Sequence, residues 1–320
     1  MTQYWPAING YLPLILFVGV LFAERAFPIP VHLHPFWALR QMAQLFARRV
    51  HPSNKRPRSQ QRISGLMAML FMLLFWVALP ALLYSLAELK VWFAAVILWL
   101  CLSSQPWLRE AQLIQKSLQR GQKQLARVRL QRWLNRDCES LSALGIEKAA
   151  SEQCVKRQLQ GWFGVLFWFA VAGPIAALCY RVCFELNRAW PVQLTYWRDF
   201  GAVNNALFRL LNWPPYFITL AVLTVAESFA SYRRSMGHKA RFNFSHFGDH
   251  EQQIFSSLTR LFRLELGGPV KYQGTKIKRL RFMHSQPLPH NRIRHTILCL
   301  TCIQFPLFII ALGITYLRVM

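Results

Sequence analysis

Six long apolar runs, separated by loops of which most are basic, constrain the fold of this chain more than any other feature. The runs cover roughly residues 10–27, 65–87, 91–107, 161–184, 214–231 and 295–317. A transmembrane helix needs about 20 predominantly apolar residues. The sequence therefore predicts an all-α, polytopic integral membrane protein, a single membrane domain over residues 1–320 with about six membrane-embedded helices. The first and third runs are short, so each either crosses fully or re-enters the same face.

The basic residues follow the order of these runs. Loop 34–64 holds seven Lys and Arg, loop 108–160 holds eleven, and loop 232–294 holds thirteen, whereas loop 185–213 holds three. With six spans, the three rich loops fall on one side of the membrane. Because Lys and Arg accumulate in cytoplasmic loops, we expect loops 108–160 and 232–294 to be basic cytoplasmic segments and both termini to be periplasmic.

This topology also accounts for the net charge of +25, in a chain whose residues are 54% hydrophobic. A basic face beside a bilayer attracts anionic lipid, by about 1 kcal/mol per basic residue near the surface. We therefore expect the lipid bilayer, with anionic lipid at its cytoplasmic face, as a partner. No base-reading motif is present, so we expect no nucleic-acid partner. The oligomeric state is left open.

Two cytoplasmic segments have helical character. From Arg109 to Asp137 the chain has no Pro and one Gly. Its basic residues at 116, 120, 123 and 127 have helical spacing, which predicts one basic stripe on an amphipathic helix at the membrane surface. The segment from Asp137 to Arg157 predicts a second helix, with Ser142 as its N-cap.

Several polar residues leave alternatives open. Cys299 and Cys302 lie inside an apolar run, which favours buried thiols over a disulfide framework. Glu227 lies late in the fifth run, where it is either a functional residue or the partner of Arg233 and Arg234 in an interfacial ion pair. Four ligand-type residues lie close together without regular ligand spacing: His238, His246, Asp249 and His250. We therefore favour ordinary loop histidines and predict no metal site.

The run 161–184 carries features that a simple anchor does not need. Gly173-Pro174 predicts a helix kink, which serves either packing or a neighbouring cavity. Arg181 either snorkels to the interface or belongs to a site. In the last basic loop, Gly267-Gly268-Pro269 either offers backbone amides to a phosphate or forms only a turn.

Short motifs along most of residues 22–281 follow one another in a specific order. They are His34-Pro35, Arg136-Asp137, Gly145-Ile146, Glu152, Leu166-Phe167-Trp168, Gly173-Pro174, Tyr180-Arg181, Phe200-Gly201, Asn212-Trp213 with Pro215, and LGGPVKYQG from Leu266 to Gly274. This order resembles the CobD/CbiB family of cobalamin-biosynthesis membrane proteins, the adenosylcobinamide-phosphate synthases.

The resemblance implies a bacterial inner-membrane enzyme that joins aminopropanol, or its phosphate, to adenosylcobyric acid, using ATP and Mg²⁺. A corrinoid or another anionic ligand would then be a partner. The implied catalytic residues are Glu152 and Asp137. The implied substrate- and phosphate-binding residues are Arg136, Tyr180, Arg181, Gly267, Gly268 and Tyr272.

The chain departs from the family pattern where the family has carboxylates. The positions concerned are Lys156, Gln160, Asn187, Phe208 and Arg209, and Arg157 replaces a family Asn. Because Mg²⁺ prefers carboxylate ligands, these changes indicate lost or altered chemistry. The related AmpE branch, which also lacks many of the acids, provides the alternative: a non-catalytic membrane signalling or sensor protein linked to β-lactamase regulation.

Overall fold

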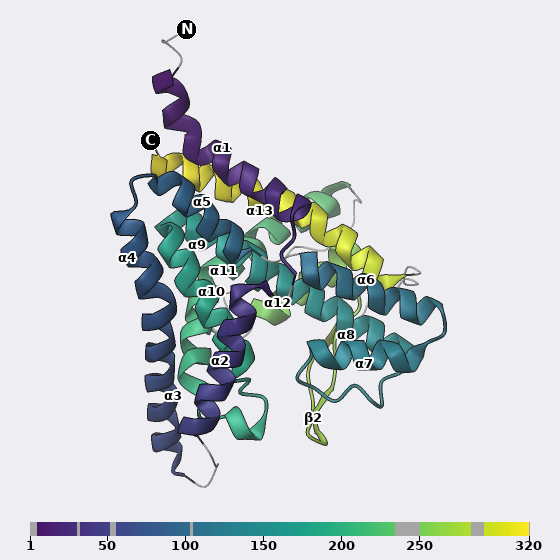
Figure 1. Cartoon of the computed structure of the whole chain (residues 1–320). Coiled ribbons are helices and arrows are strands. Elements are labelled where there is room, and N and C mark those ends of the chain that lie inside the picture. The colour runs from purple at the N-terminus through teal and green to yellow at the C-terminus, as the bar shows by residue number, and fades with distance from the viewer. Residues whose placement is uncertain are drawn as a thin grey trace. The chain divides into compact units, whose positions relative to one another are not determined.

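Helices make up nearly all of the regular structure in the computed structural model of this chain (Figure 1). The structure describes residues 5–30, 33–51, 56–102, 105–233, 250–282 and 291–319. These residues form two compact units. The first comprises residues 1–106, 160–211 and 308–320, and the second comprises residues 107–159 and 212–307. The all-α prediction is confirmed.

The first unit is a bundle of helices. Its elements are α1 (Trp5–Ala26), α2 (Pro35–Val50), α3 (Arg58–Leu73), the π-helix η2 (Leu74–Ala78), α4 (Leu79–Leu86), α5 (Lys90–Cys101), α9 (Gly164–Ala172), α10 (Pro174–Ala189), the short η4 (Thr195–Trp197), and parts of α11 (Ala202–Arg233) and α13 (Arg292–Val319). Helix α10 is central because α2, α5 and α9 all pack against it. Large side chains fill this core, and Trp190, Tyr180 and Phe200 are fully buried.

The second unit carries the polar helices and the strands described by the structure. Its elements are α6 (Gln105–Gln119), α7 (Lys123–Trp133), α8 (Ala143–Lys156), α12 (His250–Phe262), β1 (Leu266–Gly267), β2 (Val270–Tyr272), β3 (Thr275–Ile277), β4 (Arg281–Phe282) and the remaining parts of α11 and α13. The π-helix η3 (Arg157–Phe163) follows α8 directly. Strands β1 and β4 pair antiparallel, as do β2 and β3. Helix α8 and the β1 segment form the frame of the candidate site described below.

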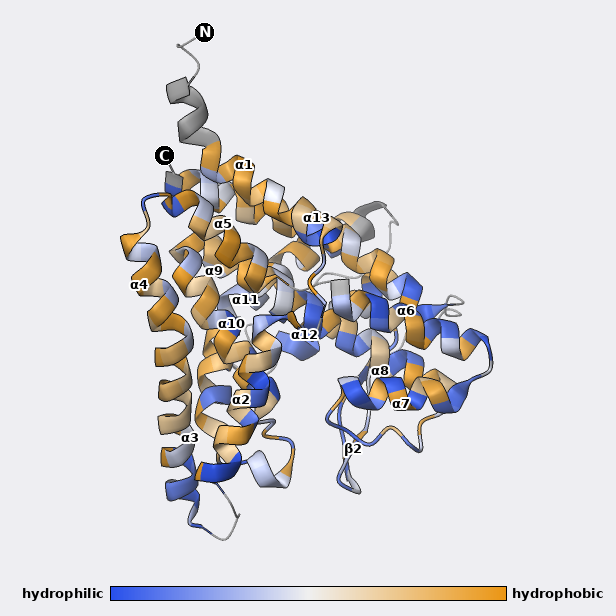
Figure 2. Ribbon diagram, viewed as in Figure 1, coloured by the Kyte–Doolittle hydropathy of each residue, from blue (hydrophilic) through white to orange (hydrophobic). Residues whose placement is uncertain are grey.

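Among the residues that the structure describes, four helical segments are long and apolar enough to span a membrane: Arg58–Leu86, Lys90–Gln119, Ala202–Phe229 and Arg292–Arg318. In Figure 2 the first is mostly hydrophobic after a hydrophilic start, and only 17% of its apolar window is buried inside the protein. Its exposed side chains include Leu70, Phe71 and Leu74. Exposed apolar surface of this extent fits acyl chains and not water, so the chain is an all-α membrane protein. The full set of six spans stays a prediction.

The apolar run 161–184 forms two separate helices, whereas the sequence predicted one kinked helix. Helix α9 ends at Ala172, Gly173 has a φ of 87°, and Pro174 begins α10. Proline is well tolerated at the first turn of a helix and poorly inside one. Arg318 donates to the carbonyl of Phe169 at 3.2 Å, near the end of α9. A cation there is favourable, because the C-terminal end of a helix carries partial negative charge.

The predicted surface helix from Arg109 to Asp137 is wrong as a single element. Helix α6 ends at Gln119 and α7 begins at Lys123, with Gly121 at a φ of 73° between them. Glycine adopts this left-handed conformation without steric cost, so it ends the helix and interrupts the predicted basic stripe. The second prediction is confirmed, because the Ser142 hydroxyl accepts the Gly145 N–H at 3.1 Å and caps α8.

Candidate functional site

A pocket of about 400 Å³ lies in the second unit, between α8 and the glycine turn at the end of β1. Five cationic side chains line it, together with three carboxylates and the Gly-Gly-Pro turn. The cations are Arg136, Lys148, Lys271, Lys276 and Arg281, and the carboxylates are Asp137, Glu152 and Glu265. The volume is within the range of small-molecule sites, and the excess of cations favours an anionic ligand.

Glu152 lies at the inner wall of the pocket and connects its two sides. One carboxylate oxygen accepts the N–H of Gly267 at 2.8 Å. The other lies 3.4 Å from Nη1 of Arg136 and 3.9 Å from Nη1 of Arg279. The Glu152 side chain is only 6% exposed. Because a buried carboxylate is stable only with partners of this kind, Glu152 fixes α8, the glycine turn and two arginines in one arrangement.

The glycine turn has a backbone that other residues cannot follow easily. Gly267 and Gly268 have φ values of 75° and 104°. Both amides already have acceptors, because Gly267 donates to Glu152 and Gly268 donates to the carbonyl of Leu280 at 2.7 Å. The structure therefore places both glycines at the pocket. Their donation to a phosphate stays a prediction, and it requires these amides to change partners.

Asp137 joins the start of the pocket to the β2–β3 hairpin. Its N–H donates to the carbonyl of Lys271, and its carboxylate accepts the N–H of Gly274, both at 2.9 Å. Tyr272 lies on β2, half-buried and outside the lining of the pocket.

Next to Asp137, burial raises the pKa of the Cys138 thiol to about 11. The Cys138 side chain is therefore a neutral thiol at neutral pH.

Lys148 is the cation that the pocket affects most. Burial and the nearby charge of Arg281 lower the pKa of Lys148 below its usual value, although Glu265 and Glu152 act in the opposite direction. A bound anion would favour the charged form of this lysine. Lys148 also lies beside the glycine turn, because a Cβ on Gly268 would be 3.6 Å from its Nζ. Lysine at this position is therefore suited to contact a phosphate.

We expect Gly267→Ala to destabilise the protein more than Gly274→Ala. Both positions have a positive φ, which costs an alanine about 1–2 kcal/mol. At Gly267 a Cβ would also overlap the carbonyl oxygen of Leu280, whereas at Gly274 nothing lies within 4 Å. Thermal unfolding of the two variants in detergent should therefore show a lower melting temperature for Gly267→Ala. Equal decreases in the melting temperature of the two variants would contradict the close packing of the turn.

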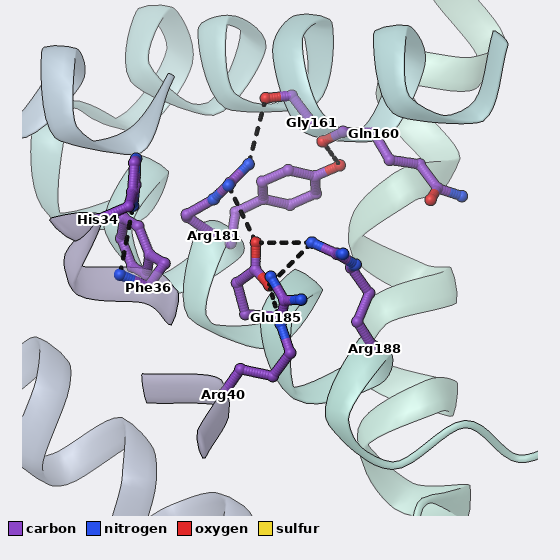
Figure 3. Close-up of polar contacts among 9 residues, drawn as sticks. His34, Phe36, Arg40, Gln160, Gly161, Arg181, Glu185 and Arg188 are labelled. Atoms are coloured by element: carbon purple, nitrogen blue, oxygen red, sulfur yellow. Dashed lines mark hydrogen bonds and ion pairs between the residues drawn. The ribbon is translucent and has the colours of Figure 1, made fainter. Parts of the chain in front are cut away.

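The first unit contains a second polar cluster, centred on Glu185 of α10 (Figure 3). Three guanidinium groups converge on this carboxylate, whose side chain is 1% exposed. Arg181 and Arg40 each lie 2.9 Å from it, and Arg188 lies 3.1 Å away. The guanidinium carbon of Arg181 also lies 5.3 Å from the ring centroid of Phe36. Arg181 is thus buried in an ion-pair network and does not snorkel.

Tyr180 and Arg181 also contact the π-helix η3. The Tyr180 hydroxyl donates to the carbonyl of Gln160 at 2.8 Å, and Arg181 donates to the carbonyl of Gly161 at 3.5 Å. A π-helix is a common device at functional sites because it alters the regular hydrogen bonds of an α-helix. His34 belongs to the same unit, where its ring accepts the Phe36 N–H at 3.3 Å and caps α2. The binding roles of Tyr180 and Arg181 stay predictions.

Some residues of these clusters were not singled out from the sequence. Lys148, Glu265 and Arg281 line the pocket, and Glu185 is the centre of the second cluster. The helical spacing of Glu185 from Arg181 and Arg188 was a usable signal, because residues three and four apart share a helix face. Glu227 lies 3.1 Å from Arg260. The predicted ion pair with Arg233 and Arg234 falls outside the side chains that the structure describes.

The donor set of the pocket fits phosphate oxygens better than a metal ion held by the protein alone. Within the described residues, no group of three His, Cys, Asp or Glu side chains is placed to bind a metal. Glu152 is already paired with Arg136, and Glu265 lies 3.3 Å from Arg292. His238, His246 and Asp249 lie outside the described residues. A preformed magnesium site does not match these carboxylates, because their oxygens already have basic partners.

The fold and the pocket define an all-α membrane protein with a cationic site next to a glycine turn. A model of the CobD/CbiB protein family matches residues 16–300. The chain therefore belongs to the CobD/CbiB family. No solved structure matches it.

Curated relatives include several bacterial proteins named "Cobalamin biosynthesis protein CobD". The one from Chromobacterium violaceum is 23% identical over 266 residues, which is 82% of this chain and 83% of that protein. The one from Stutzerimonas stutzeri is 27% identical over 201 residues, covering 62% and 64% of the two chains. The one from Pelobacter propionicus is 25% identical over 194 residues, covering 60% and 59%.

Proposed function

We propose that this chain acts in cobalamin biosynthesis as an adenosylcobinamide-phosphate synthase, attaching aminopropanol or its phosphate to adenosylcobyric acid by an ATP-dependent amide-forming reaction. The observation that carries the proposal is the pocket around Glu152. It combines Arg136, Glu152 and the Gly267-Gly268 turn, which are three of the family motifs, although they are far apart in the sequence. The relatives' names, which assign them to cobalamin biosynthesis, support the same role.

The pocket residues suit a reaction in which phosphate groups are bound and transferred. Lys148, Arg281 and Lys276 supply positive charge from two sides of the pocket. Charge-assisted hydrogen bonds from Arg and Lys are the usual protein contacts to phosphate. ATP bound here would supply the free energy for amide formation. Glu152 would hold Arg136 and the glycine turn in place while the ligand binds.

The basic side chains that line the pocket can compensate the charge of a phosphate. Because basic residues neutralise phosphate directly, part of the charge compensation that a metal ion provides falls to the protein. Positive charge is in excess around the pocket, with Lys271 and Lys276 exposed at its rim. We propose that the pocket faces the cytoplasm of a bacterial cell, at the inner membrane, with anionic lipid next to the basic loops and both termini periplasmic.

Genetic complementation tests the proposed activity. We expect this gene to restore growth of a synthase-deficient, cobalamin-requiring bacterium that is fed cobyric acid, because the chain would make the missing amide bond. The measurement is the growth rate on cobyric acid, with immunodetection of the protein in the membrane fraction.

Cobinamide serves as the control, because it lies beyond the proposed step and should support growth without this gene. Growth on cobinamide alone, with the protein present in the membrane, would contradict the proposed synthase activity. It would instead favour the non-catalytic, AmpE-like role that the lost carboxylates suggest.

A further inference from the structure

Lys156 occupies a position where the resemblance implies a glutamate, and its side chain is paired with a carboxylate. Its Nζ lies 2.7 Å from a carboxylate oxygen of Glu251. Lys156 is the last residue of α8, and Glu251 lies in the first turn of α12. A carboxylate in the first turn is favourable, because the N-terminal end of a helix carries partial positive charge. A negative charge is thus present at this place, but a different helix provides it.

Arg279 connects this ion pair to the pocket. One of its terminal nitrogens lies 3.6 Å from Glu251, and the other lies 3.9 Å from Glu152. Glu152 in turn is paired with Arg136. The five side chains therefore alternate in charge, in the order Lys156, Glu251, Arg279, Glu152 and Arg136.

The ionisation of Glu251 fits this arrangement. Burial acts to raise its pKa, but the charges of Lys156 and Arg279 outweigh burial, and the pKa of Glu251 is lowered. A lowered pKa means that Glu251 contributes stability above its unfolded-state pKa and loses this contribution as the pH falls through the folded-state pKa. At neutral pH Glu251 is therefore a carboxylate that can hold Arg279.

We propose that Glu251 is a positioning residue for Glu152, and that it replaces the carboxylate missing at position 156. By holding one end of the Arg279 guanidinium group, Glu251 keeps the other end close to Glu152. Glu152 is thereby held in the rotamer that accepts the Gly267 N–H. This inference rests on the proposed function only in assigning Glu152 to the reacting site, and the positioning itself is a property of the pocket.

The test measures binding of inorganic pyrophosphate to the full chain in detergent, by isothermal titration calorimetry. Four proteins form a cycle: the wild type, Glu251→Gln, Glu152→Gln and the double variant. We expect Glu251→Gln to change the affinity about tenfold in the wild-type background, as directly coupled neighbours do. In the Glu152→Gln background the same substitution should have little effect, because Glu251 acts through Glu152.

A matched control comes from the Glu227–Arg260 pair of the same unit, which does not line the pocket. Glu227→Gln should leave the pyrophosphate affinity unchanged. Thermal unfolding of each variant confirms that binding is measured on folded protein. An effect of Glu251→Gln that is equal in both backgrounds would overturn the inference, as would a wild-type chain that does not bind pyrophosphate.

A charge exchange provides a second variant in case Glu251→Gln does not fold. Lys156→Glu and Glu251→Lys should each reduce growth on cobyric acid, because each breaks the ion pair. The double variant should restore growth, because it forms the same ion pair with the two residues exchanged and keeps a carboxylate within reach of Arg279. If neither single variant nor the double variant supports growth on cobyric acid, the result counts against the inference. Growth of the wild type decides the proposed function, whereas the affinity cycle decides the role of Glu251, so the two can fail separately.

Discussion

Glu185→Gln is expected to destabilise the first unit by about 3–5 kcal/mol, because removing one partner of a buried ion pair leaves its counter-charge uncompensated. Three arginines share this carboxylate, and Arg181 is itself buried, with a side chain only 4% exposed. A neutral amide of the same shape cannot balance them. The loss should appear as a large decrease in the melting temperature of the purified protein in detergent and as less protein in the membrane.

Glu88→Gln is the control for this variant. Glu88 is exposed in the connection between α4 and α5. Its replacement by glutamine removes the same charge as Glu185→Gln, but at a position that is not buried. Its melting temperature should remain close to that of the wild type. If the two variants unfold at the same temperature, Glu185 does not hold α2 and α10 together in the way that Figure 3 shows.

Glu152→Gln is expected to abolish growth on cobyric acid while the protein still inserts into the membrane. The amide oxygen can still accept the Gly267 N–H, but the charge that holds Arg136 and Arg279 is lost. Released arginines would disturb the phosphate-binding geometry without affecting the apolar spans. The measurement combines growth on cobyric acid with immunodetection in membrane fractions.

Glu147→Gln provides a matched comparison on the same helix. Glu147 lies 3.7 Å from Arg292 and does not line the pocket. We therefore expect Glu147→Gln to support growth at near the wild-type rate. Normal growth of Glu152→Gln would remove Glu152 from the reacting site.

The sequence predicted those features that depend on local patterns or on ordered motifs. Apolar runs predicted a helical membrane protein, and Ser142 marked the start of α8. The family motifs also identified Glu152 and Gly267, which are separated by 115 residues and hydrogen-bonded in the structure. Nothing in the local sequence around either residue indicates this contact, so the motif order alone brought them into one predicted site.

Other features could not be predicted because their signals are too short or too distant. Strands of two or three residues, such as β1 and β2, give no alternating pattern to recognise. Gly121 ends α6 through a left-handed conformation, which a stretch of strong helix formers conceals. The pairing of Lys156 with Glu251 joins two helices whose sequences are far apart, and only the fold shows it.

The hydrogen bond between Glu152 and Gly267 has a consequence for how the protein is made. Its two ends are separated by α9, α10 and the long apolar helix α11. Closing a loop of this length costs conformational entropy, which only the prior folding of the intervening segments reduces. During synthesis, α8 leaves the ribosome well before residues 265–282 exist. The pocket is therefore a late product of biogenesis, because a newly made chain cannot complete it until the segment that carries Gly267 has been made and the intervening helices have folded.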